Sequence, residues 1–215
     1  MAYFSRFEER INTWSHAAGI FIAIVAGSVF LWMSLRASDA WAALGVSLYL
    51  FGMGASYVTS TLYHALPASR AKRVLRRWDH AAIYWHIAGS YSPVTLVALR
   101  HAGGWGWGLF GFVWTCAAVG TLMSFRHLRE HSHMETVCFV LMGLSVLVAF
   151  RPLLAAAPPS AVWWIVAEGV CYITGAVFYT LRREYMHAVF HFFVLAGSLC
   201  HILAVRDVLF AYLPL

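Results

Sequence analysis

Seven long runs of apolar residues dominate this sequence and leave little choice of fold. They cover roughly residues 17–35, 41–63, 80–99, 104–125, 135–155, 161–181 and 188–211. Each run is long enough for an α-helix to cross a bilayer, which takes about 20 residues. The runs are continuously apolar and lack the two-residue alternation of transmembrane strands. The sequence therefore predicts an all-α, polytopic membrane protein built as a bundle of seven transmembrane helices.

Composition excludes a water-soluble protein. Of the 215 residues, 61% are hydrophobic and only 11% are charged, whereas a soluble domain is roughly 45–50% apolar. Such a chain has too little charge to solvate its own outside. The connections between runs are short, so we expect a single membrane domain over residues 1–215. The first run lacks a convincing small-residue cleavage site and is expected to stay in the mature protein.

The basic residues predict an orientation. The net charge of +6 does not indicate a nucleic-acid partner, because Lys and Arg form short clusters between apolar runs and no continuous basic face. If the connections alternate between the two sides, one side carries eleven basic residues and the other carries four. By the positive-inside rule the N-terminus is cytoplasmic and the C-terminus external. The eleven are Arg6, Arg10, Arg70, Lys72, Arg73, Arg76, Arg77, Arg126, Arg129, Arg182 and Arg183, and the four are Arg36, Arg100, Arg151 and Arg206.

Polar residues gather at the cytoplasmic ends of three predicted helices. The second run ends in STLYH (residues 60–64), the third begins at Asp79 and His80, and the seventh begins with His187 and His191. His187 and His191 are four residues apart and share one helix face. Ionisable residues inside a membrane are costly and are candidates for function. Three imidazoles at one depth resemble the ligands of a catalytic zinc site, with Asp79 placed to orient or deprotonate a water.

Other interpretations stay open at this stage. The same histidines could lie at the headgroup level and bond backbone or lipid groups. A rival metal site, His127 with His131 and His133, lies in a connection rich in charge that also fits a solvated loop.

Further polar residues follow the faces of the first and later helices. Glu9, Asn12, His16 and Gly19 fall on one helical face and could support the metal ligands from behind. Alternatively, Asn12 or Ser15 caps a turn at the interface.

Deeper in the membrane, Glu168 and His201 both lie about 21 Å from the cytoplasmic helix ends and could pair. His86 could line a cavity or bond a buried hydroxyl. The segment 89–93 (GSYSP) predicts a kink in the third helix that opens room beside the polar cluster.

Together, four motifs resemble the hemolysin III family, the bacterial branch of the progestin and adipoQ receptor family, which is grouped with alkaline ceramidases as metal-dependent membrane hydrolases. The resemblance covers nearly the whole chain and is specific in combination. The motifs are Glu9-x2-Asn12-x2-Ser15-His16-x2-Gly19, Ser60-x3-His64, Asp79-His80-Ala-Ala-Ile83 with Gly89-Ser-Tyr-Ser-Pro93, and His187-x3-His191.

The resemblance implies a seven-helix protein of the bacterial plasma membrane with zinc near its cytoplasmic face. By analogy with adiponectin receptors, His64, His187 and His191 would hold the zinc. Asp79 and Ser60 would act around it. The chain departs from the family pattern at Ala188, where many bacterial relatives have an acidic residue.

Two functions follow from these observations. The first is a zinc-dependent hydrolase acting on a lipid amide or ester that enters from the bilayer, with Asp79 as the base. The alternative is a non-enzymatic receptor, channel or lipid-homeostasis factor in which zinc joins the second and seventh helices. A lytic role is not expected, because no amphipathic pore-forming segment stands out in the sequence.

Reporter fusions test the predicted orientation. A reporter that is active only outside the cytoplasm should be active when fused after residue 215 and inactive when fused ahead of residue 1. If the reporter fused after residue 215 is inactive, the C-terminus is cytoplasmic, and the seven-span interpretation is overturned.

Overall fold

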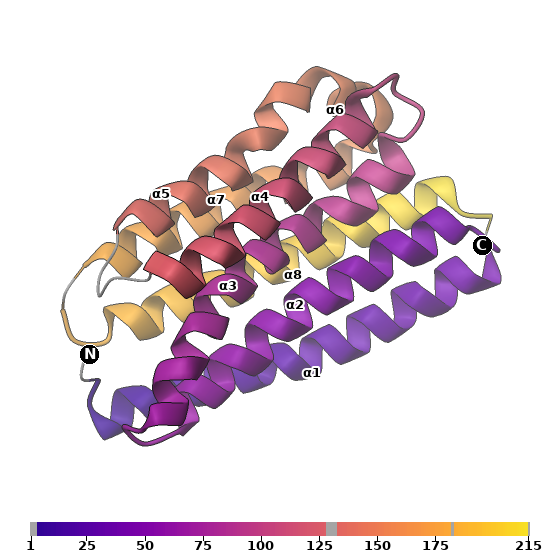
Figure 1. The fold of residues 1–215 in the computed structure, drawn as a ribbon. Helices are drawn as coiled ribbons and strands as arrows, with labels where there is room; N and C mark the ends of the chain where they lie inside the picture. The colour runs from indigo at the N-terminus through magenta and orange to yellow at the C-terminus, as the bar shows by residue number, and fades with distance from the viewer. Residues whose placement is uncertain (1–3, 128–132, 182, 215) are drawn as a thin grey trace.

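The protein is a bundle of long helices that run side by side along one axis (Figure 1). The computed structural model describes residues 4–127, 133–181 and 183–214. Within these residues the regular elements are helices, as the all-α prediction requires. They are α1 (Arg6–Arg36), α2 (Ala40–Ala65), α3 (Arg70–Pro93), the π-helix η1 (Val94–Ala98), α4 (Trp105–His127), α5 (His133–Leu144), the 3₁₀-helix η2 (Ser145–Ala149), α6 (Phe150–Ala156), α7 (Pro159–Thr180) and α8 (Met186–Tyr212).

Six helical segments are long and apolar enough to cross a membrane. They are α1, α2, α4, the segment Met134–Ala156, α7 and α8. α3 is not among them, because its first two turns carry Arg70, Lys72, Arg73, Arg76 and Arg77. The third predicted span, residues 80–99, is helical but is divided between α3 and η1. α1 and α8 begin at the same end of the bundle, where α2 and α7 finish, and we refer to it as the N-terminal end.

α1 begins earlier than its apolar run. Its N-cap is Ser5, whose hydroxyl accepts the N–H of Glu8 while the Glu8 carboxylate accepts the N–H of Ser5. This reciprocal capping box satisfies two N–H groups at the helix start. The alternative in which Asn12 or Ser15 caps the helix is therefore wrong, since both residues lie inside it.

The segment predicted to kink contains a change of helix type. Pro93 has no N–H to donate, and the chain after it adopts the wider π register, in which Leu99 N–H bonds the Val94 carbonyl at 3.0 Å. Nearby hydroxyls donate hydrogen bonds to backbone carbonyls. The Ser92 hydroxyl bonds the Ala88 carbonyl at 2.9 Å, and the Thr95 hydroxyl bonds the Tyr91 carbonyl at 2.8 Å. The helix thus continues past the proline, and these bonds pair several of the polar groups around it within the protein.

The fifth predicted span is interrupted rather than continuous. Tyr91 of α3 donates its hydroxyl to the carbonyl of Gly143 and accepts the N–H of Val146 at 3.0 Å. A side chain that inserts into the hydrogen-bond ladder of a helix breaks its regularity. The rod accordingly changes from α5 to η2 and then to α6.

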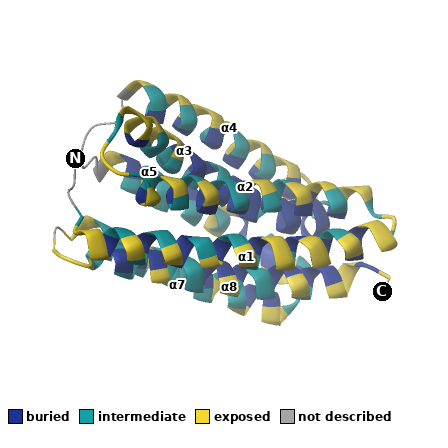
Figure 2. Cartoon of the chain, turned by 90° about the horizontal axis from the view of Figure 1, so that it is seen from below, coloured by how far each residue is buried: buried dark blue, intermediate teal, exposed yellow. Residues whose placement is uncertain are grey.

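The outside of the bundle is more apolar than much of its inside. Large apolar side chains such as Phe21, Trp163 and Phe210 are 61–73% exposed, and the outward faces of the helices are exposed along their length (Figure 2). Fully buried positions include polar residues such as Asn12 and His191. This arrangement suits lipid surroundings, where polar groups must find partners within the protein.

α2 and α3 approach each other closely at glycines. A Cβ added to Gly52 would collide with the carbonyl oxygen of Trp85, and one added to Gly89 would lie 2.8 Å from the Leu48 oxygen. Small residues of this kind let helix backbones pack tightly in membranes. The contact fixes α3 against α2, and thereby places Asp79 relative to Ser60.

Gly52→Ala should destabilise the protein, because the added methyl must push two backbones apart. Overpacking of this kind costs about 1–3 kcal/mol, which should lower Tm in detergent by several degrees. Gly54→Ala, in the same helix with open space around its Cβ, is the matched control and should leave Tm unchanged or raise it. Equal Tm values for the two variants would contradict this packing.

Candidate metal centre

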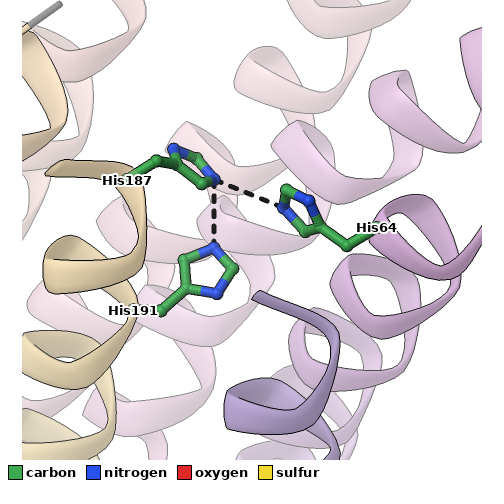
Figure 3. A group of neighbouring side chains, drawn as sticks. All are labelled: His64, His187 and His191. Atoms are coloured by element: carbon green, nitrogen blue, oxygen red, sulfur yellow. Dashed lines mark hydrogen bonds between the residues drawn. The ribbon is translucent and has the colours of Figure 1, made fainter. Parts of the chain in front are cut away.

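Three imidazoles converge at the N-terminal end of the bundle. His64 comes from the last turn of α2, and His187 and His191 from the first turns of α8. The Nε2 atom of His187 lies 3.3 Å from Nε2 of His64 and 3.0 Å from Nε2 of His191 (Figure 3). His64 and His191 are buried, and His187 is half-buried. The four-residue spacing on α8 brings its two rings together, and the third ring is brought there by the packing of both α2 and α8 against α1.

A carboxylate fixes the ring of His64. Its Nδ1 lies 2.6 Å from Oε2 of Glu9, and the other carboxylate oxygen accepts from Nζ of Lys72 at 2.7 Å. Lys72 also donates to the carbonyl of Leu66 at 2.9 Å. Because a carboxylate can only accept, Nδ1 of His64 carries a proton, and Nε2 is the ring nitrogen left to bind a metal.

A hydroxyl fixes the ring of His191 in the same way. The Ser15 hydroxyl donates to the carbonyl of Asn12 at 2.9 Å and lies 3.1 Å from Nδ1 of His191. Since its proton is used, this hydroxyl accepts from Nδ1, and the lone pair of His191 again lies on Nε2. Partners of this kind set the tautomer of metal-binding histidines.

This donor set fits a metal ion. Lone pairs on Nε2 atoms 3.0–3.3 Å apart repel one another unless a cation or a proton lies between them. Zn–N bonds of about 2.0–2.1 Å in a tetrahedral site place neighbouring nitrogens about 3.3 Å apart, close to the observed spacing. The three histidines, whose ligand atoms all lie within 4.8 Å of one another, could therefore hold one ion.

The first turn of α1 also positions the first turn of α8. Oε1 of Glu8 accepts the N–H of Tyr185 at 2.6 Å, and Tyr185 adopts a left-handed backbone at φ +64° just before α8 begins. The ring of Phe4 lies over His187 at a centroid distance of 4.7 Å. α1 thus supports all three histidines, through Glu8, Glu9 and Ser15.

Two of the three histidines open into a cavity of about 740 Å³ inside the bundle. His187 and His191 line it together with both predicted catalytic residues, Ser60 and Asp79. The Asp79 carboxyl lies against the Ser60 hydroxyl.

The rest of the cavity wall is mostly apolar. On α7 the lining residues Val166, Val170 and Ile173 are also 40–61% exposed on the flank of the bundle. The cavity therefore extends from the histidines to the side of the protein that lipid would cover.

Other residues singled out by the sequence lie outside the histidine cluster. His80 pairs instead with Glu135, whose carboxylate lies 2.8 Å from Nδ1 and also accepts from Ser124 at 3.0 Å. His16 stacks on His191 with ring centroids 3.7 Å apart. Of the rival loop group, His131 and the side chains of His127 and His133 lie outside the described residues.

Two deeper predictions are confirmed. Glu168 and His201 do pair, at 2.6 Å between Oε2 and Nδ1. His86 both lines the cavity and meets a buried hydroxyl, with Nε2 3.4 Å from Oγ of Ser198.

Two supporting residues, Lys72 and Glu8, were not predicted from the sequence. In the sequence Lys72 was used only to predict the orientation in the membrane, although its ammonium group bonds the Glu9 carboxylate. Glu8 could have been found from the S-x-x-E capping pattern, but nothing in the sequence predicts its bond to Tyr185, which is 177 positions away.

Comparisons with known proteins agree with this geometry. A sequence profile of the family described as Haemolysin-III related matches residues 4–202. The chain is 31% identical over 192 residues to Hemolysin-3 of Bacillus cereus, covering 89% of this chain and 87% of that protein. It is 26% identical over 213 residues to the human monocyte to macrophage differentiation factor, covering 95% of this chain and 85% of the relative. It is also 25% identical to the ADIPOR-like receptor IZH2 of Saccharomyces cerevisiae, covering 90% of this chain and 69% of the relative.

Metal analysis of purified variants tests the centre. His191→Ala should abolish stoichiometric metal, because it removes one of three ligands. Glu9→Gln should keep the site but weaken metal affinity by about 10- to 100-fold, as the loss of a ligand's orienting partner typically does.

The matched control is His101→Ala, which removes an exposed imidazole at the opposite end of the bundle and should leave the metal content unchanged. One metal ion per chain in the His191→Ala variant would show that the ligands are assigned incorrectly.

Proposed function

This chain belongs to the haemolysin-III-related family of multi-pass membrane proteins, and from that premise we propose that it is a zinc-dependent hydrolase of a lipid amide or ester. The single observation that carries the proposal is the convergence of three imidazoles, two of which line a lipid-sized cavity that also contains a carboxylate and a hydroxyl. We place the enzyme in the bacterial plasma membrane with its N-terminus cytoplasmic, as the distribution of basic residues favours.

Zinc is the metal that suits these ligands. Three imidazoles with one position left open are the pattern of catalytic zinc sites, and zinc held this way polarises a carbonyl and activates water for attack. His64, His187 and His191 would hold the ion, and Glu9 and Ser15 would keep the Nε2 atoms of His64 and His191 aimed at it. Other transition metals also accept imidazole, but they have no support here beyond that.

Asp79 and Ser60 would handle the proton and the substrate. Asp79 would accept a proton from the attacking water and return it to the leaving amine or alcohol, a role that carboxylates commonly fill. Ser60 would orient that carboxylate, since its hydroxyl lies against it. Both residues line the cavity beside His187 and His191, so they can reach a carbonyl placed at the same end.

The cavity walls favour a lipid as the substrate. Below the polar end the lining is formed by residues such as Ile83, Phe139, Val140 and Val194. An acyl chain can enter from the exposed flank of α7 without crossing water, while its amide or ester group reaches the histidines.

A non-enzymatic role is the second candidate. The observation that favours it is that the three histidines join α2 to α8, two helices far apart in the sequence that both pack on α1. A metal bound there would act as a structural clamp for a receptor, channel or lipid-homeostasis factor.

Asp79→Asn separates the two candidates. Under the enzyme proposal the variant should fold and keep its zinc but lose hydrolysis of a ceramide or fatty-ester probe by about 10²- to 10⁴-fold, the usual contribution of a general base. Under the structural alternative the parent hydrolyses neither probe, and the substitution changes Tm only modestly.

The control is Asp207→Asn, which removes a carboxylate of α8 that pairs with its neighbour Arg206 at 2.7 Å. That pair is far from the histidines, and exposed pairs contribute only about 0–1 kcal/mol, so hydrolysis should be unchanged. Full hydrolysis by Asp79→Asn would remove Asp79 from the mechanism.

A further inference from the structure

A second buried polar group lines the same cavity at a greater depth. Glu168 of α7 and His201 of α8 are 8% and 4% exposed, and their side chains are joined at 2.6 Å between Oε2 and Nδ1. Both residues line the cavity. The proposed hydrolysis uses neither of them, and ionisable residues this deep in a membrane protein are costly to retain.

One nitrogen of His201 has no hydrogen-bond partner in the described part of the chain. Its Nδ1 bonds Glu168, but its Nε2 is buried and meets no hydrogen-bonding group among the described residues. The hydroxyl of Tyr49, whose ring packs against His201 at 5.0 Å between centroids, is likewise buried without a partner in that part of the chain. A buried polar atom without a partner costs free energy, and a ligand that supplied a hydrogen bond here would relieve that cost.

The distance from the metal centre specifies the ligand. His201 lies ten residues after His191 on the same helix, which is about 15 Å along its axis. Apolar side chains such as Val94, Ile165 and Val194 line the cavity around this polar point. A ligand that spans both points is apolar along its length, with one polar group at its end and a second about 15 Å further on.

We propose that Glu168 and His201 form a second recognition point, which accepts a hydrogen bond from a hydroxyl group on the chain of the lipid held in the cavity. Glu168 orients the His201 ring, and Nε2 makes the bond. This inference rests on the proposed function in that the cavity takes up a lipid whose polar end lies at the three histidines. It requires no hydrolysis, so it can fail or hold independently of the enzyme proposal.

Two fatty acids test this selectivity on the zinc-loaded, full-length protein in detergent. Octadecanoate and 12-hydroxyoctadecanoate differ by one hydroxyl, and carbon 12 of an extended chain lies about as far from the carboxylate as His201 lies from His191. Displacement of a fluorescent fatty acid gives both affinities. The hydroxylated acid should bind about fivefold more tightly, the equivalent of one net hydrogen bond.

The variant that tests the two residues is the double substitution Glu168→Leu/His201→Leu. Replacing both partners of a buried pair by apolar residues avoids an unpaired charge and preserves folding better than either single change. The double variant should bind octadecanoate as the parent does and lose the preference for the hydroxylated acid. Retention of the preference in this variant would overturn the proposal.

A third fatty acid tests the position of the recognition point on the parent protein alone, without any variant. In 17-hydroxyoctadecanoate the hydroxyl lies beyond the pair, toward Leu99, Leu109 and Phe150 at the far end of the cavity, and the parent should bind it no more tightly than octadecanoate. Equal affinity of the parent for octadecanoate and the 12-hydroxy acid would overturn the second recognition point alone. If the parent binds none of the three acids, the recognition point and the lipid-filled cavity both fail, whereas the zinc and hydrolysis measurements judge the metal centre separately.

Discussion

The convergence of three imidazole nitrogens at one end of the bundle is the constraint on which the rest of the structure depends. Nε2 atoms 3.0–3.3 Å apart in a buried site need their rings held in one tautomer and one orientation. The protein meets this need from α1, where Glu9 and Ser15 hold two of the rings and Glu8 holds the start of α8. The first helix is therefore a support for the site as well as a membrane span.

The same constraint explains why polar residues line the inside of an apolar bundle. The stacked ring of His16 links the metal centre to Tyr57, whose hydroxyl bonds Ser198 at 2.7 Å. Further along the cavity are His86, Glu168 and His201. In lipid these groups have no water to bond, so each must meet another protein group or a ligand. One continuous cavity thus connects the converging histidines with the buried Glu168–His201 pair.

The sequence predicts the helices and the centre of the site better than it predicts their details. Long apolar runs predict the helices, because bilayer thickness sets their length, and the i, i+4 spacing of His187 and His191 predicts two of the three converging histidines. The break between α5 and α6 was not predictable, because it depends on a hydroxyl from Tyr91, about fifty residues earlier. Similarly, only the packed structure separates His80, which bonds Glu135, from the converging histidines. The local sequence pattern predicts the helices, whereas contacts between residues far apart in the sequence decide which polar groups meet.

X-ray absorption at the zinc edge of the purified protein is the most direct test of the metal centre. The account predicts one zinc per chain with three imidazole nitrogens and one oxygen at about 2.0–2.1 Å, and loss of the imidazole signal in the His64→Ala variant. A shell of sulfur at about 2.3 Å, or a zinc content well below one per chain after loading, would contradict it.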